Sequence, residues 1–191
     1  MKTKFAITIL FCSLLFGCGA QLEDYDDSER RFDLFEYFSG SVIAWGMVQD
    51  FSGKQTRRFE VVIVGKVVEN RLTLEEDFVF DDGETQRRVW QIDKLSEKKY
   101  QGTAGDVVGI ALGEERGNAM QWQYDLILPY GDSSTVVSMD DWLYRQDDNH
   151  LFNITKISKF GVEVGQVTIF FQKSPTPTKI QITHKQDKIS K

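Results

Sequence analysis

The chain has 191 residues, a formal net charge of −6, 13% aromatic residues and only three prolines. This length suits one domain with a substantial core, and the aromatic content favours a β-rich globule over a disordered chain. The acidic balance excludes the electrostatic footprint expected of a protein that binds nucleic acid or adsorbs to an anionic lipid surface.

The first residues are typical of an export signal. Two lysines precede an apolar run at residues 5–16, which is too short to span a membrane permanently. The run ends in Leu15-Phe16-Gly17-Cys18, which resembles the bacterial lipobox, where cleavage before the cysteine leaves it acylated. We therefore expect a lipoprotein signal peptide at residues 1–17 and lipidation at Cys18, with an ordinary signal peptide as the alternative. Gly19 in place of Asp predicts the periplasmic leaflet of the outer membrane.

A tether and a short helix are expected next. Residues 18–30 comprise the lipidated cysteine and a polar, acidic stretch, which predicts a flexible tether. Ser28 is a candidate N-cap for a helix over residues 31–38, whose apolar side would plug one end of a small barrel. Residues 174–191 form a thin tail in which Ile180 and Ile182 alternate and are candidates for a short edge strand.

Residues 31–173 are predicted to form an all-β domain. Short apolar alternations separated by turn residues indicate a meander of antiparallel strands. Closure into a β-barrel of 8–10 strands would remove the two unpaired edges. The nine expected strands are residues 41–49, 55–67, 71–80, 86–94, 100–111, 118–128, 135–144, 151–159 and 164–172.

One hairpin, at residues 72–92, predicts its own register. Asp81-Asp82-Gly83 suits a three-residue loop in which the glycine takes a positive φ. Leu74 then meets Trp90, and Glu76 meets Arg88 on the same apolar face, whereas a two-residue turn would pair residues of unlike polarity. We therefore expect an ion pair between Glu76 and Arg88 that points into the barrel.

Three glycines fall within the expected strand at residues 100–111. Gly102, Gly105 and Gly109 indicate bends or bulges at a barrel corner, or positions where a ligand approaches the backbone.

The inward face collects the candidate ligand-binding residues. Asp140 and Asp141 have opposite phases, so one of them must point inward with its strand. Buried charges require partners or solvent, which indicates either a hollow, wet interior or a tight polar network that fixes register. The candidate ligand-binding residues are Arg88, Glu76, Trp90, Tyr124, Trp122, Asp140 and Asp141.

The sequence gives no catalytic, metal or cofactor motif. His150 and His184 have neither metal-ligand spacing nor a serine partner. Adjacent Asp140 and Asp141 point to opposite faces of a strand and cannot form an acid–base pair. We therefore expect no enzyme, no metal and no cofactor.

Many sequence blocks between residues 38 and 173 resemble one family. The clearest are Trp45-Gly46-Met47-Val48-Gln49-Asp50, Leu74-Glu75-Glu76-Asp77-Phe78, Arg87-Arg88-Val89-Trp90, Gly105-Asp106-Val107-Val108-Gly109 and Asp140-Asp141-Trp142. They are similar to a proteobacterial lipoprotein family catalogued as domain of unknown function 3833. The resemblance implies a lipocalin-like (calycin-type) barrel and favours a lipid or fatty-acid ligand. It carries no catalytic residue over.

The leading hypothesis is an outer-membrane lipoprotein whose barrel binds or carries a fatty acid or other small amphiphile in the periplasm. In this reading Arg88 would meet the head group and the aromatic wall would hold the tail. The expected partners are the membrane, through acylated Cys18, and this ligand, but no nucleic acid; the sequence identifies no protein partner. The alternative is a non-catalytic structural or interaction module with a filled core, and an enzyme that uses Glu76 ranks third.

Overall fold

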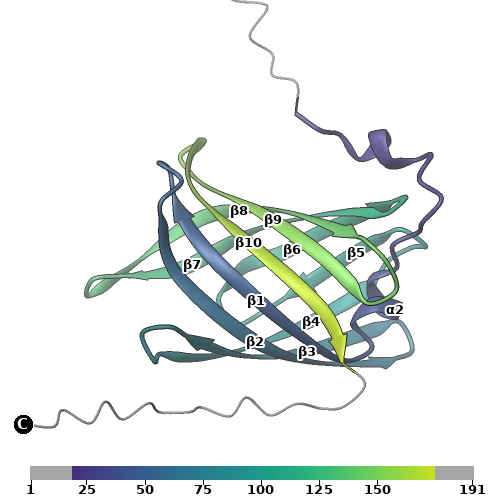
Figure 1. Ribbon diagram of the computed structural model, residues 1–191, viewed down its shortest axis with the longest axis horizontal. Coiled ribbons are helices and arrows are strands. Elements are labelled where there is room, and N and C mark those ends of the chain that lie inside the picture. The colour runs from purple at the N-terminus through teal and green to yellow at the C-terminus, as the bar shows by residue number, and fades with distance from the viewer. Residues whose placement is uncertain (1–18, 175–191) are drawn as a thin grey trace, which may run out of the picture.

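The computed structural model describes residues 19–174, apart from the side chain of Tyr130. Ten antiparallel strands close into one barrel in the order β1-β10-β9-β8-β7-β6-β5-β4-β3-β2 (Figure 1). The strands are β1 (Gly40–Asp50), β2 (Gln55–Val68), β3 (Arg71–Phe80), β4 (Thr85–Lys94), β5 (Lys99–Thr103), β6 (Val107–Arg116), β7 (Ala119–Tyr130), β8 (Ser133–Arg145), β9 (His150–Lys159) and β10 (Val162–Ser174). The predicted all-β antiparallel barrel is confirmed.

The hairpin of β3 and β4 has the predicted register. Leu74 pairs with Trp90, Glu76 with Arg88 and Asp77 with Arg87. The amide of Phe80 donates to the carbonyl of Glu84 at 2.9 Å, and Gly83 has φ +87°. The three-residue loop therefore forms because only this alignment places apolar residues opposite apolar residues on the buried face.

The expected strand at residues 100–111 is wrong, because the chain turns back within it. β5 ends at Thr103 and β6 begins at Val107, with Gly105 in the turn between them. Gly109 has φ +71° at the irregularity between Val108 and Leu112, as a bulge requires. Gly102 instead allows close packing, since an added Cβ would lie 2.8 Å from the Trp122 ring.

The expected helix is shorter than predicted and has a different cap. Helix α2 covers Leu34–Phe38, and the Asp33 side chain, not that of Ser28, accepts a hydrogen bond from the amide of Glu36 at 2.9 Å. Asp is a favoured N-cap residue, and it lies next to the first helical turn. Four of the five helical residues are buried, and α2 plugs one end of the barrel (Figure 1).

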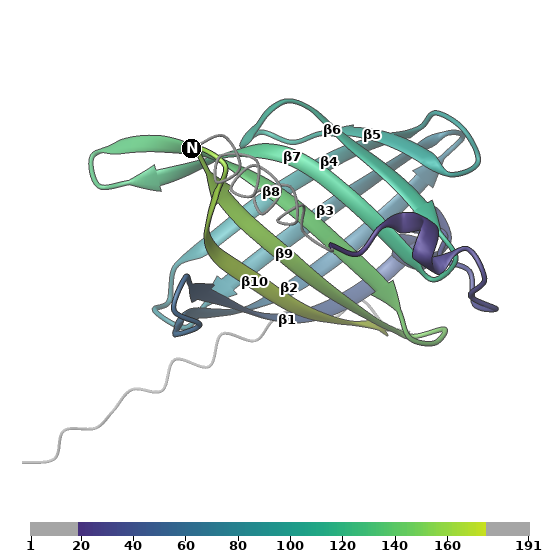
Figure 2. The same cartoon turned by 90° about the horizontal axis from the view of Figure 1, so that it is seen from above.

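Residues 19–30 differ from the expected free tether, because they contact the barrel. They include a 3-10 helix, η2 (Leu22–Tyr25), which lies against β6 and β7 outside the barrel (Figure 2). The Tyr25 ring packs on Trp142 and Tyr144, with centroid distances of 6.0 and 5.7 Å. Within residues 19–174, no helix is long and apolar enough to cross a membrane. The predicted signal peptide, Cys18 and the strand at Ile180 lie outside the described residues.

The inward side chains divide the barrel into two halves. Near α2 they are dry, since Val42, Leu72 and Leu151 have no solvent-exposed surface. Farther along the same strands, Val48, Phe78 and other inward residues are partly exposed although they pack on the core. Water therefore reaches the interior from the end opposite α2. We call the half next to α2 the closed half and the solvent-accessible half the cup.

Candidate ligand-binding site

A polar layer crosses the cup. Glu76 on β3, Arg88 on β4, Tyr124 on β7 and Asp141 on β8 all point inward, because each occupies the same phase as the core residues of its strand. All four side chains are largely buried, although each residue keeps some solvent-exposed surface. The structure thus brings together four of the candidates that the sequence pattern indicated.

Two tryptophans form the floor under this layer. Trp90 and Trp122 are each 6% exposed and meet edge to face, with ring centroids 5.7 Å apart. The Tyr124 ring stands against Trp90 at 5.3 Å, also edge to face. Such contacts lock the aromatic rings and give the polar layer a rigid base.

The expected ion pair between Glu76 and Arg88 is wrong, because Arg88 pairs with a different carboxylate. The two residues face each other across β3 and β4, but the guanidinium of Arg88 bonds to Asp106 instead. Its Nε lies 3.1 and 3.0 Å from the two Asp106 oxygens, and its Nη2 lies 2.7 Å from Oδ2. The turn between β5 and β6 delivers Asp106 in this bidentate geometry, which Arg prefers.

The two other inward carboxyls lack such a partner. Burial raises the pKa of Glu76 to about 7, and nearby Arg88 lowers it only in part. Burial also raises the pKa of Asp141 to about 6, against favourable contacts with Thr155 and Tyr124. One Asp141 oxygen, Oδ1, is buried without a hydrogen-bond partner. Unsatisfied buried polar atoms are rare and costly, so this oxygen marks a place for an incoming donor.

Asp140 does not join the site, which corrects its place among the candidates. Its carboxylate faces outward and accepts hydrogen bonds from Gln121 at 2.6 Å and Gln123 at 3.2 Å. The inward phase of β8 instead belongs to Val137, Met139 and Asp141, because these residues cover the core. Asp140 thus stabilises the outer surface of the sheet.

An apolar rim lies between the polar layer and solvent. Its side chains are partly exposed and pack against the core or its small neighbouring cluster. They are Val48, Phe78, Phe80, Val107, Leu128, Ile157, Val167 and Ile169. The inner wall of the cup therefore carries apolar side chains beyond a polar layer, a distribution that matches a molecule with a polar head and an apolar body.

Sequence reasoning missed three members of this layer. Asp106 lies in the turn between β5 and β6, where strand alternation gives no direction for a side chain. Asn153 and Thr155 are buried, and the Thr155 hydroxyl donates to Asn153 Oδ1 at 3.0 Å. Their signal was present, because they alternate with Leu151 and Ile157 on β9. Within the described chain, no three His, Cys, Asp or Glu side chains are grouped to hold a metal ion.

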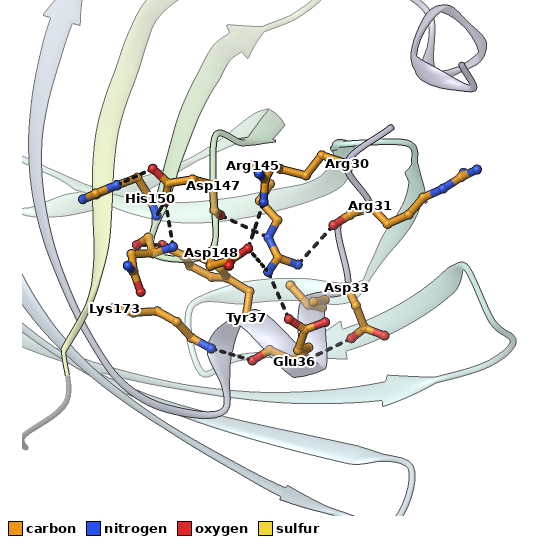
Figure 3. Close-up of polar contacts among 12 residues, drawn as sticks. Arg30, Arg31, Asp33, Glu36, Tyr37, Arg145, Asp147, Asp148, His150 and Lys173 are labelled. Atoms are coloured by element: carbon orange, nitrogen blue, oxygen red, sulfur yellow. Dashed lines mark hydrogen bonds and ion pairs between the residues drawn. The ribbon is translucent and has the colours of Figure 1, made fainter. Parts of the chain in front are cut away.

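The closed half carries two surface hollows, of about 780 and 480 Å³. The smaller one lies over Arg145, whose three guanidinium nitrogens each donate to a protein oxygen (Figure 3). It donates to the carbonyls of Arg31 and Asp147 at 3.1 and 3.2 Å and to the Glu36 carboxylate at 3.0 Å. Arg145 therefore fastens α2 and the chain before it to β8.

Comparison with known proteins supports the fold. Residues 12–173 match the family model described as "Protein of unknown function (DUF3833)". The fold is similar to that of the S-type phycobiliprotein lyase CPES from Guillardia theta, a lipocalin-like barrel, with a TM-score of 0.53 and 9% sequence identity. The match covers 74% of this chain and 92% of the lyase chain. Among curated proteins, none matches the sequence.

Proposed function

This chain belongs to the DUF3833 family, and we propose that its barrel is a carrier that binds one small amphiphile in the cup. The observation that carries the proposal is the order of layers along the inner wall: apolar rim, polar layer, tryptophan floor. An amphiphile that enters head first buries its apolar body against the rim and places its head at the polar layer. Burial of each methylene contributes roughly 0.8 kcal/mol.

The proposed role is binding without catalysis. Glu76 has the raised pKa of an acid–base group, but the guanidinium of Arg88 is engaged by Asp106. The similarity in fold to a lyase is compatible with a pocket for a small molecule, whereas chemistry depends on the side chains of the site.

Fluorescence of N-phenyl-1-naphthylamine, an uncharged probe of apolar cavities, tests the proposal. We expect the wild-type protein to enhance the emission and a ten-carbon amphiphile to displace the probe. Val167→Trp would fill the cup from β10 and abolish both effects. Thr168→Trp, one residue along on the outer face, is the matched control and should leave them unchanged. Equal emission with both variants would disprove binding in the cup.

We further propose that Cys18 is acylated and holds the protein on the periplasmic face of the outer membrane. The support is the lipobox-like Leu15-Phe16-Gly17-Cys18 after a basic and apolar leader. Radiolabelled palmitate should be incorporated into the wild-type chain and not into Cys18→Ser. Incorporation into the variant at the wild-type level would rule out this anchor.

A second candidate function, as an interaction module, is favoured by an aromatic surface on the outside of the barrel. Trp45 and Phe152 are 42% and 41% exposed, and both rings contact Phe170, at centroid distances of 6.3 and 5.1 Å. Exposed aromatic groups of this kind are typical of protein interfaces. Crosslinking in cells through a photoreactive residue at Phe152 would reveal a partner, with Glu75 on β3 as the control position.

A further inference from the structure

The charges of the cup are unbalanced. Three carboxylates, those of Glu76, Asp106 and Asp141, surround one guanidinium, that of Arg88, at the polar layer; Arg57 on β2 lies at the rim over Phe80, where it pairs with Asp82 and Glu84. Asp106 occupies the Nε and Nη2 side of Arg88, which is the side that grips a carboxylate in two-point recognition. One of the two edges of this guanidinium, which we expected to receive an anionic head group, is therefore occupied by the protein itself.

An anionic head group would meet an unfavourable field here. At the Nε and Nη2 edge of Arg88 it would have to displace Asp106, and at the Nη1 side it would lie near the carboxyls of Glu76 and Asp141. Like charges a few ångströms apart repel strongly where surrounding protein reduces solvent screening. A fatty-acid carboxylate is thus the less favourable of the possible head groups.

From this charge arrangement we propose that the natural ligand carries a protonated amine, so that an alkylammonium head group lies between Glu76, Asp141 and Tyr124. This inference rests on the proposed function, because it assumes that the cup binds an amphiphile. An ammonium group has three donors, and the free Asp141 Oδ1 is an acceptor already enclosed by the site. The rings of Trp90, Trp122 and Tyr124 add the aromatic faces that attract cations.

Proton release should accompany this binding. The groups that face the head-group position are Glu76 on β3, Arg88 on β4, Asp106 in the turn before β6, Tyr124 on β7 and Asp141 on β8. Burial raises the pKa of Glu76 to about 7 and that of Asp141 to about 6, so both carboxyls are partly protonated at weakly acidic pH. A cation favours their ionised forms, and ammonium binding should therefore strengthen as the pH rises from about 5.5 to 8.

Three ligands of equal chain length test the inference: octylammonium, octan-1-ol and octanoate, titrated by calorimetry into the wild-type protein at pH 8. We expect octylammonium to bind at least about tenfold more tightly than the other two, which corresponds to one lost charge contact. Glu76→Gln and Asp141→Asn should each weaken octylammonium binding about fivefold to tenfold and leave octan-1-ol within about twofold.

Each of these variants has a neighbour on the opposite face of its strand as a control. Glu75 pairs with Arg87 outside the barrel, and Asp140 bonds to Gln121 and Gln123. Glu75→Gln and Asp140→Asn remove the same charges from the same strands and should not change octylammonium affinity.

The outcomes separate the inference from the function on which it rests. Octanoate or octan-1-ol binding as tightly as octylammonium would overturn the amine assignment and leave amphiphile binding intact. Failure of all three ligands and of the naphthylamine probe would overturn both. The ligand series on the wild-type protein gives this answer even if a variant does not fold.

Discussion

The two halves of the barrel differ in the hydrogen bonding of their buried polar side chains. In the closed half, Arg145 is only 8% exposed, and its guanidinium has partners on three sides. The buried Glu115 accepts a hydrogen bond from the amide of Leu34, which ties α2 to β6. In the cup, by contrast, Glu76 and Asp141 are enclosed without a full set of partners. Polar groups of the closed half thus join α2 to the barrel wall, although burial raises the pKa of Glu115 to about 7, as it does for Glu76 in the cup.

The strongest test of this contrast compares two apolar residues of β9. Leu151 is fully buried in the closed half, whereas Ile157 lines the cup and is partly exposed. Leu151→Ala should lower the free energy of unfolding by about 3 kcal/mol, because it leaves a cavity in a packed core. Ile157→Ala should cost only about 1 kcal/mol. Urea unfolding measures both, and equal losses would show that the cup is as tightly packed as the closed half.

The second test concerns the arginine that fastens α2. Arg145→Met should lower the free energy of unfolding by about 2 kcal/mol, because the carbonyls of Arg31 and Asp147 lose their donor. Arg30→Met is the matched control, since Arg30 makes an exposed ion pair with Asp148 and should cost less than about 0.5 kcal/mol. Thermal unfolding followed by circular dichroism would compare the two. Similar losses in the free energy of unfolding for the two variants would show that Arg145 does not stabilise the attachment of α2 to the barrel.

The third test measures how much Glu76 in the cup contributes to the pH dependence of stability. The pKa of Glu76 is raised from an ordinary value of 4.5 to about 7, so the folded state holds this proton more tightly than the unfolded state. The contribution of Glu76 to stability is therefore greatest below pH 4.5 and is lost as the pH rises to 7.

Glu76→Gln should remove the part of the pH dependence that Glu76 contributes, leaving that of Asp141 and Glu115, and raise the free energy of unfolding at pH 8 by about 1 kcal/mol relative to the wild type. Denaturant titrations at pH 5 and pH 8 would measure it. Glu75→Gln, on the outer face, should follow the wild-type profile. A variant that loses stability at pH 8 would indicate that Glu76 is fully paired.

The smallest expected effect lies at the rim of the cup. Phe160 and Gly161 form the two-residue loop between β9 and β10, and Phe160 has φ +52° and is 95% exposed. A turn with two positive φ values prefers Asn-Gly, so Phe160→Asn should raise the free energy of unfolding by about 0.5 kcal/mol. The melting temperature should rise by a few degrees or less. A decrease would mean that the Phe160 ring makes a stabilising contact in solution.

The sequence allowed much of the barrel to be predicted, for reasons visible in β3 and β4. Their polarity pattern admits a single register, so the sequence alone predicts the partners of Leu74 and Glu76. The same logic failed at residues 100–111, because Gly105 occurs in a turn without proline or an Asn-Gly pair. Because glycine is compatible with a turn, a bulge or a bend, Gly105 does not by itself predict the turn that separates β5 from β6.

The candidate site was predictable only as far as strand periodicity extends. Alternation placed Glu76, Arg88, Trp90, Trp122 and Tyr124 inward, and the structure confirms those directions. It could not identify Asp106, which reaches Arg88 from a turn, nor choose between Asp140 and Asp141. Both decisions depend on contacts between segments that are distant in sequence, and periodicity contains no such information.

The seam between β1 and β10 constrains how the protein can fold. The first strand pairs with the last, from Ser41 with Ser174 to Asp50 with Gly165. This contact closes a loop that contains nearly the whole domain. The chain loses the entropy of loop closure before the contacts of the seam stabilise it, and this slows folding. Until β10 is present, β1 and β9 are open edges that can pair with other chains. A nascent chain that lacks its last strand is therefore aggregation-prone, and it gains a cup able to enclose a ligand only when the seam closes.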